Sequence, residues 1–502
     1  MTMSAFERLR EACGIIRDLE YTAALLDWDQ QTYMPANAES NRICQLTAIA
    51  GVIHEKMTSP DFAARLDAAE KECCDFPSDA LETCLIRRLR RDFEKQSKVP
   101  LELATQLAEA AARAHGAWIQ ARENSRFDLF APHLEKLLDL RRRYAELFAP
   151  YVNIYDPLLD NFEEGFTAAQ LDVLFAGLRE KLLPLFRRII ASQPENEFPK
   201  GIYGEKEQLA FTDEILHALG YDFTRGRQDQ SAHPFTTGFG LNDVRITTRI
   251  FPEMPLSALL SSIHECGHAL YEQGISRELD RTPLADGASF GFHESQSRLW
   301  ENLVGRSRAF WEYCFPVFCK YFPEQLRNAS AEKIWHAVNH VEASLIRTES
   351  DEVTYNLHIM LRYEMEKELL SGSLSVTDAP DAWNAKSREL LGVEPANDAE
   401  GILQDIHWSM GEFGYFPTYA LGNLLAAQFW CAAEAEIPDL EGEIARGNFR
   451  TLLKFLRERV HIHGAKFSPA QTMKKALGTE KINPDCFISL LERKYSQICG
   501  FR

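Results

Sequence analysis

Helical spacing of apolar residues over almost the whole length is the feature that most limits the fold of this chain. In residues 101–115 and 134–144, apolar side chains recur at steps of three and four, with charged side chains between them. The pattern runs from the start to about residue 195 and again from Leu256 nearly to the end. Such apolar stripes are typical of helices that pack on one another. We therefore predict a large, mainly α-helical protein.

The length leaves the number of domains open, because 502 residues suffice for about two to four average domains. No linker rich in proline, glycine or serine and no tandem repeat interrupts the sequence. With 45% apolar and 26% charged residues, the composition is that of an ordinary folded protein. We predict one large unit over residues 1–502, with a cleft.

The net charge limits the kinds of partner that the protein can bind, and the cysteine content indicates its cellular compartment. A net charge of −19 disfavours nucleic acid and anionic membranes, which repel an acidic protein. No apolar run reaches the length of a membrane span, and the first ten residues carry charges where a signal peptide is apolar. The 11 cysteines are scattered and form no C-x-x-C pair. We expect a cytoplasmic protein with reduced thiols.

A small β-element is predicted at about residues 233–251, where β-branched residues replace helix formers. Val244, Ile246 and Thr248 alternate with polar side chains, as expected for a half-buried strand. An edge strand here can bind an extended peptide through main-chain hydrogen bonds. This element directly precedes the segment that carries the strongest chemical signal.

That signal is His264-Glu265-Cys266-Gly267-His268, within a helix predicted from Pro255 to Gly274. Residues four apart on a helix differ by about 40° in direction, so both histidines can bind one zinc ion. Glu265 then lies beside the ion and can take a proton from a water activated by it. Cys266 points away from His268 and is predicted to be buried. The spacing predicts peptide hydrolysis; the alternative is two ordinary helix histidines.

A catalytic zinc ion needs a third protein ligand, and the sequence offers two candidates. A second helix is predicted after the turn-rich segment 282–287, and Glu294 lies early on it. Glu301 follows seven residues later, on nearly the same face. Either carboxylate would complete the site, and both could instead be surface charges.

Two later segments concentrate further reactive side chains. Residues 345–355 place Arg347 and several carboxylates in a predicted helix, and residues 401–419 combine His407, Tyr415 and Tyr419 with glycines. An arginine near the cleft can bind a terminal carboxylate, and a histidine or tyrosine can donate to the oxyanion formed on peptide hydrolysis. An internal salt bridge and an aromatic core explain the same residues equally well.

With these segments, the chain resembles the carboxypeptidase Taq family, also called thermostable carboxypeptidase 1, over essentially its whole length. The similarity rests on five blocks in order: 243–247 (DVRIT), 264–268 (HECGH), 293–296 (HESQ), 346–351 (IRTESD) and 401–408 (GILQDIHW). Ser350 departs from the pattern, which usually has alanine. The resemblance implies His264, His268 and Glu294 as ligands and Glu265 as general base and acid.

The resemblance also implies a fold and an activity. It suggests helical subunits with two lobes flanking a deep groove, paired as a homodimer. Each subunit would hold one zinc ion, with cobalt also acceptable, and would remove single C-terminal residues from peptides with broad specificity. We further expect Arg347 and Arg245 to contact the substrate, and His407, Tyr415 and Tyr419 to stabilise the transition state.

Other activities fit the same metal site. An oligoendopeptidase, a dipeptidyl-carboxypeptidase or an aminopeptidase would differ only in how the groove is closed. A non-catalytic helical binding protein would keep the metal for structure. Glu265 argues against the last reading, because a structural zinc ion needs no base.

Overall fold

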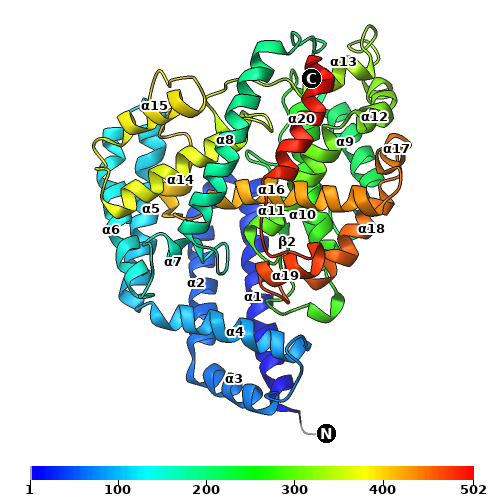
Figure 1. Cartoon of the computed structure of the whole chain (residues 1–502). Coiled ribbons are helices and arrows are strands. Elements are labelled where there is room, and N and C mark those ends of the chain that lie inside the picture. Colours follow the sequence, from blue (N-terminus) through cyan, green and yellow to red (C-terminus); the bar gives the residue numbers. More distant parts are fainter. Residues whose placement is uncertain (1–2, 502) are drawn as a thin grey trace. The chain divides into compact units, whose positions relative to one another are not determined.

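The computed structural model describes residues 3–501 and consists mainly of helices (Figure 1). In these residues there are twenty α-helices and one three-stranded sheet, which packs against α10 (Pro255–Gly274). The predicted mainly α fold with a small β-element beside the motif helix is confirmed. None of the described helices is long and apolar enough to cross a membrane. The chain forms two compact units, each assembled from three stretches of sequence.

Unit 1 comprises Met1–Ser97, Glu197–Val338 and Phe429–Lys481. Its central helix is α10, which packs on α9, α11 and the sheet and is buried over most of its surface. The helices of unit 1 are α1 (Ala5–Thr32), α2 (Glu39–Thr58), α3 (Pro60–Glu72), α4 (Leu81–Lys98), α9 (Glu205–Leu219), α10, α11 (Phe290–Arg298), α12 (Arg308–Tyr321), α13 (Ala331–Val338), α17 (Leu440–Ala445), α18 (Arg450–Arg459) and α19 (Pro469–Leu477).

Unit 2 comprises Lys98–Asn196, Asn339–Gln428 and Ile482–Arg502. The first half of its helix α14 is buried on all sides, and only the second half has half-exposed charged residues, Glu364, Lys367 and Glu368. The helices of unit 2 are α5 (Leu101–Asn124), α6 (Ala131–Glu146), α7 (Asp156–Leu159), α8 (Ala168–Ser192), α14 (Tyr355–Ser371), α15 (Ala379–Leu390) and α20 (Asp485–Cys499), and α16 (Pro417–Glu436) begins here and ends in unit 1.

The sheet has the order β1-β3-β2, with β1 (Gln228–Gln230) parallel and β2 (Thr236–Gly238) antiparallel to β3 (Val244–Thr248). Ile246 pairs with Gln228 on one side and Thr236 on the other. The element begins earlier than predicted, because the polar strand β1 carries no apolar alternation in its sequence. It ends at Thr248, three residues before the predicted end at about residue 251. The Thr248 hydroxyl lies 3.0 Å from that of Ser261 on α10.

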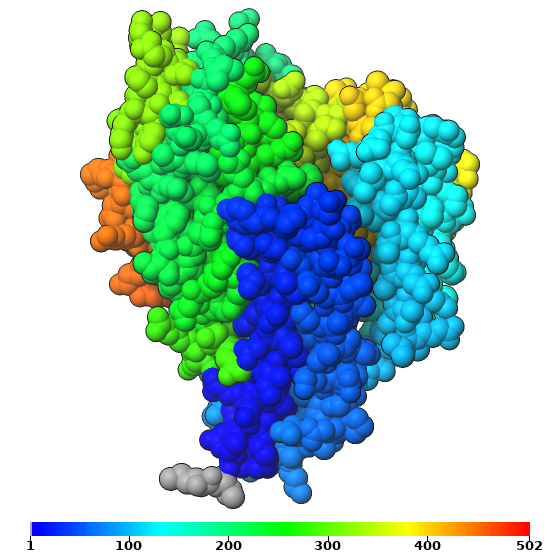
Figure 2. Space-filling model, turned by 180° about the vertical axis from the view of Figure 1, so that it is seen from behind, coloured from blue at the N-terminus to red at the C-terminus, as the bar shows by residue number. Residues whose placement is uncertain are grey.

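The N-terminal helices α1 and α2 pack side by side, and Figure 2 shows these segments, in blue, on the surface of this face. Most of α2 is exposed, including Ile43 and Val52. Trp28 near the end of α1 is buried. It therefore belongs to the core, although the residues next to it in the sequence are acidic and polar.

The helix predicted over residues 345–355 is absent; the chain there forms a short 3₁₀ turn, Arg347–Glu349, and α14 begins only at Tyr355. The reason is Asp351. Its carboxylate accepts hydrogen bonds from the main-chain N–H groups of Glu342, Val353 and Thr354, at 2.9–3.1 Å. A short acidic side chain that binds nearby N–H groups in this way competes with helical hydrogen bonding.

Candidate active site

Helix α10 places the histidine motif at its centre. It begins at Pro255 and ends at Gly274, as predicted. The glycine serves close packing there: a Cβ atom on Gly274 would lie 2.7 Å from the side chain of His461. Cys266 is fully buried, as predicted, and faces the core.

Gly267 allows α11 to approach α10 closely. A Cβ atom at this position would lie 2.5 Å from the Cα atom of Ser297 and 2.7 Å from the carbonyl oxygen of Gln296. The N-terminus of α11 is capped by Ser289, whose hydroxyl accepts a hydrogen bond from the Phe292 N–H. The glycine inside the motif therefore brings the helix that carries Glu294 next to the two histidines.

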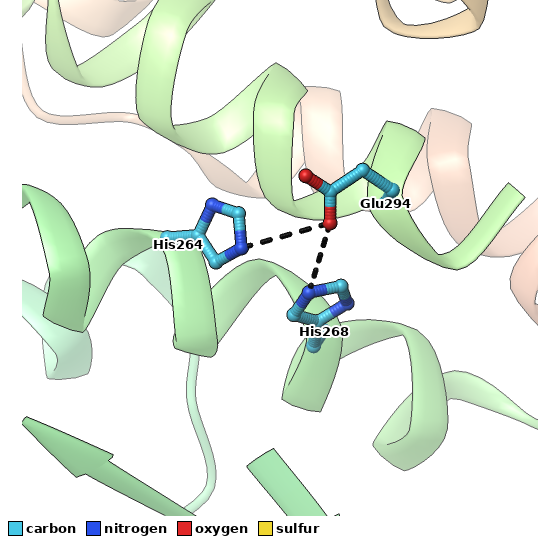
Figure 3. A group of neighbouring side chains, drawn as sticks. All are labelled: His264, His268 and Glu294. Atoms are coloured by element: carbon cyan, nitrogen blue, oxygen red, sulfur yellow. Dashed lines mark ion pairs between the residues drawn. The ribbon is translucent and has the colours of Figure 1, made fainter. Parts of the chain in front are cut away.

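The side chains of His264, His268 and Glu294 converge on one point (Figure 3). Their potential ligand atoms lie within 4.8 Å of one another. Glu294 Oε2 is 3.7 Å from His264 Nε2 and 3.5 Å from His268 Nε2. Ligands about 2.0–2.2 Å from a tetrahedral zinc ion are about 3.3–3.6 Å apart. The separation of 3.5 Å falls in this range and that of 3.7 Å is slightly longer, so the three residues suit a divalent metal ion such as zinc.

In each histidine, the nitrogen that does not face Glu294, Nδ1, lies close to another side chain. His264 Nδ1 lies 2.8 Å from Glu301 Oε2, and His268 Nδ1 lies 2.6 Å from His293 Nδ1. Such contacts fix the ring orientation and leave Nε2 to bind a metal. The structure thus separates the two carboxylates that the sequence left as alternatives: Glu294 lies in the cluster and Glu301 behind His264. Glu301 reaches this position from a π-helical continuation of α11, Leu299–Gly305.

The charges around the cluster favour an ionised Glu294 and a neutral His268. Burial raises the pKa of Glu294, but Arg298 and the two histidines outweigh it and hold that pKa well below its usual range. The Arg298 Nε atom donates to Glu294 Oε1 at 2.7 Å. Burial lowers the pKa of His268 to about 3. Burial lowers the pKa of His264, but Glu294 and Glu301 more than reverse this and raise it. A cation would therefore find Glu294 and His268 in the states that bind metals and would compete with a proton for His264.

Glu265 lies beside the cluster and is held by a residue that the sequence did not single out. The Thr236 hydroxyl, on β2, lies 2.6 Å from Glu265 Oε2 and 2.9 Å from its main-chain oxygen. Burial raises the pKa of the Glu265 carboxyl. Thr236 was missed because a threonine in a β-branched segment carries no distinguishing signal.

Arg245 on β3 is engaged within unit 1. Its guanidinium forms two hydrogen bonds of 2.8 Å with Asp243 and lies over the rings of Trp28 and Phe239, 4.4 and 4.9 Å from their centroids. These contacts fasten the end of α1 to the sheet. Its predicted contact with substrate stays a prediction.

Arg347 in unit 2 belongs to a buried ion-pair network. Asp405 accepts hydrogen bonds from Arg347 through Oδ1 and from Arg362 through Oδ2, and Arg347 also donates to the Tyr355 hydroxyl at 2.8 Å. Burial raises the pKa of Asp405, but the two arginines more than reverse this and lower it far below its usual range. Two guanidinium groups share one carboxylate, so this group of three carries one excess positive charge.

His407, Tyr415 and Tyr419 form an aromatic cluster next to that network. His407 Nε2 lies 3.1 Å from the Tyr419 hydroxyl, and the His407 and Tyr415 rings are 5.2 Å apart. Burial, together with Arg347 and Arg362, lowers the pKa of His407 to about 3. The ring is therefore neutral at physiological pH. Its buried Nδ1 atom has no hydrogen-bond partner among residues 3–501.

The predicted site residues therefore fall into two groups. The structure brings His264, Glu265, His268 and Glu294 together in unit 1, where Arg245 also lies. It brings Arg347 together with the aromatic cluster of His407, Tyr415 and Tyr419 in unit 2.

Known proteins resemble this chain over nearly its whole length. Residues 8–495 match the model of the carboxypeptidase Taq (M32) metallopeptidase family. Thermostable carboxypeptidase 1 of Thermus thermophilus is 42% identical over 99% of both chains, and carboxypeptidase 1 of Bacillus subtilis is 38% identical over 95% of both. The crystal structure of an M32 carboxypeptidase from Deinococcus radiodurans superposes with a TM-score of 0.96, at 41% identity, and covers 99% of this chain and 100% of that one. The chain therefore belongs to the carboxypeptidase Taq (M32) family of metallopeptidases.

Proposed function

We propose that this chain hydrolyses the C-terminal peptide bond of peptides, with broad specificity, at the cluster of His264, His268 and Glu294. Its family and its relatives make it a metal-dependent carboxypeptidase. The convergence of three potential ligand atoms beside Glu265 is the observation that supports this site. Two imidazoles and one carboxylate are typical of a catalytic zinc ion and also suit cobalt. We propose one ion per chain.

Glu265 is the proposed proton carrier. A divalent ion would polarise the scissile carbonyl and make water acidic enough to attack it at neutral pH. Thr236 occupies Glu265 Oε2, so we expect Oε1 to take the proton of the attacking water. The same carboxyl then gives this proton to the leaving amine, which balances the reaction. Burial favours this second step because it raises the pKa of the carboxyl.

Strand β2 offers a place for the peptide main chain. It is an edge strand of the sheet, and its Thr236 touches Glu265. A peptide bound to this edge by main-chain hydrogen bonds would need no particular side-chain sequence. This arrangement supports broad specificity and fixes the scissile bond near the proposed base.

Arg347 is the proposed partner of the substrate's free carboxylate, with Arg245 as a second contact. The excess positive charge of Arg347, Arg362 and Asp405 supports the assignment, since a bound carboxylate would balance it. Breaking the pairing of Arg347 with Asp405 is not required, because the two arginines, Asp405 and the substrate carboxylate together carry no net charge.

His407, Tyr415 and Tyr419 are the proposed donors to the oxyanion. A neutral imidazole and a phenol can each donate one hydrogen bond to developing negative charge. The low pKa of His407 supports a neutral donor. The 3.1 Å contact between His407 and Tyr419 supports their acting together.

Subunit organisation and location are also proposals. The division of the chain into two compact units supports the proposal of one peptidase domain built from two helical lobes. The deep groove between lobes stays a prediction. Exposed Ile43 and Val52 on α2 would suit the interface of a homodimer. Free cysteines throughout residues 3–501 support a reducing compartment such as the cytoplasm.

A mass-spectrometric time course on one mixed-sequence decapeptide, free and C-amidated, tests the activity. We expect the zinc-loaded protein to shorten the free peptide one residue at a time from its C-terminus and to leave the amide intact. Internal fragments or cleavage of the amide would favour an oligoendopeptidase or aminopeptidase, and loss of two residues a dipeptidyl-carboxypeptidase. An intact peptide in the presence of bound metal would favour a non-catalytic protein.

A further inference from the structure

Glu366 is a buried carboxylate outside both groups of proposed site residues. It lies on α14 and has no solvent exposure. Its Oε2 atom accepts hydrogen bonds from the Tyr155 hydroxyl at 2.6 Å and the Gly414 N–H at 3.1 Å. Its Oε1 atom accepts one from the Trp408 indole at 2.9 Å. One donor beside α7 and two donors from residues 401–419 therefore meet on one side chain.

Two of these donors adjoin proposed oxyanion donors. Trp408 follows His407 in the 3₁₀ turn His407–Met410, and Gly414 precedes Tyr415. Gly414 has a φ of +90°, and a Cβ atom there would lie 2.7 Å from the main chain of Leu158. The loop is thus pressed against α7, and Tyr155, the third donor, directly precedes that helix.

We propose that Glu366 is a positioning residue that holds the His407–Trp408 turn and the Gly414–Tyr415 loop in the geometry needed for transition-state stabilisation. This inference rests on the proposed function of His407 and Tyr415. A buried carboxylate lowers the stability of the folded state unless its oxygens are hydrogen-bonded. A position that retains one therefore needs its hydrogen-bond donors at well-defined places. Burial raises the pKa of Glu366 to about 7, and the three donors oppose that rise.

The hydrogen-bond pattern predicts what Glu366→Gln would do. An amide nitrogen placed at Oε2 would face the Gly414 N–H, and one placed at Oε1 would face the Trp408 indole N–H. In either orientation, two donors meet and one fixed segment loses its partner. The Tyr155 hydroxyl can rotate and accept from the amide nitrogen, so Tyr155 keeps a partner in this variant. Tyr155→Phe removes one donor but leaves the bonds of Trp408 and Gly414 in place, so it should have a smaller effect.

The experiment compares steady-state kinetics of the zinc-loaded variants on a dipeptide substrate. We expect Glu366→Gln to lower kcat by about tenfold or more, as small displacements of catalytic groups do, with KM within threefold of wild type. Glu352→Gln is the matched control, because Glu352 is similarly buried in unit 2 but binds Lys494 and Tyr495 on α20. It should lower the unfolding temperature as much and leave kcat unchanged.

A double variant distinguishes positioning from general damage. In a His407→Gln background, Glu366→Gln should cause a much smaller further loss of kcat, because part of what it positions is already gone. Fully additive losses, an unchanged kcat in Glu366→Gln, or an equal kcat loss in Glu352→Gln would each overturn the inference. An active wild type with no loss in His407→Gln would overturn the proposed role of His407 and this inference together.

Discussion

The cluster of His264, His268 and Glu294 in unit 1, called the metal cluster below, and the aromatic cluster of unit 2 are held in place by different means. His264, Glu265 and His268 share one regular helix, and the helix itself fixes their spacing. His407 and Tyr415 lie on a 3₁₀ turn and a loop. Their positions depend on two buried carboxylates: Glu366 on α14, and Asp405, two residues before His407, which is held by Arg347 and Arg362.

Because of this difference, we expect the two clusters to respond differently when a supporting side chain is replaced. A helix keeps its spacing when one supporting side chain is lost, because its main-chain hydrogen bonds remain. A loop held by buried ion pairs loses both geometry and stability when a partner is removed, because the remaining charge is buried without compensation. Replacing the side chains that hold each cluster in place, one cluster at a time, tests this difference.

The largest effect on stability is expected from Asp405→Asn. The change leaves Arg347 and Arg362 buried around a neutral group, and we expect a loss of about 3 kcal/mol in the free energy of unfolding. Urea denaturation measures it. Asp485→Asn, which removes an exposed carboxylate of the same unit, should leave the free energy of unfolding nearly unchanged. If Asp405→Asn also released the metal at equilibrium, the two clusters would not be independent.

Tyr419→Phe should reduce kcat by about 10²-fold with little change in KM, as expected for loss of one oxyanion donor. Tyr415→Phe, measured beside it, shows which hydroxyl donates, because both rings belong to the aromatic cluster. Metal content should remain at the wild-type level in both. A kcat within about threefold of wild type in both variants would remove the tyrosines from the mechanism.

Glu301→Gln should weaken metal binding by about 10–100-fold, because outer carboxylates orient and polarise the histidines they contact. Competition with a chromophoric chelator measures the dissociation constant. Glu312→Gln, an exposed glutamate on α12, is the control and should bind as the wild type does. Complete loss of metal in Glu301→Gln would instead indicate that Glu301 is itself a ligand.

The smallest effect concerns pH. In the folded chain the pKa of His407 is about 3, whereas in the unfolded chain it is about 6.5. As the pH falls below about 6.5, the unfolded state binds a proton that the folded state does not, so this residue lowers stability in that range. His407→Gln should therefore lose about 1–2 kcal/mol less stability at pH 5 than at pH 7. Equal losses at both pH values would indicate an ordinary pKa.

Local sequence patterns predicted the fold class and the proximity of His264 and His268. The limits of α10 follow from proline, apolar spacing and glycine, and the four-residue spacing of His264 and His268 needs only helix geometry. The choice between Glu294 and Glu301 needed more. It depends on how closely α11 approaches Gly267 and on the π-helical segment that redirects Glu301, and neither is visible in a spacing of seven.

The aromatic cluster was harder to predict because its supports are remote in sequence. Glu366 sits among apolar residues of α14 with no neighbouring signal, and its three partners lie between 42 and 211 residues away. The helix predicted over residues 345–355 failed for a related reason, since Asp351 binds main-chain groups that a helix would have used. Side-chain to main-chain hydrogen bonds of this kind are not encoded in apolar periodicity.

Titration of metal-free protein with zinc tests the central claim most directly, with activity and bound metal measured on wild type and Glu265→Gln. We expect wild-type activity to rise in proportion to bound metal and to saturate at one ion per chain. Glu265→Gln should bind the same single ion and remain about 10²–10⁴-fold less active. Activity of Glu265→Gln within tenfold of wild type, or full wild-type activity before the ion is bound, would contradict the assignment of the reaction to this cluster.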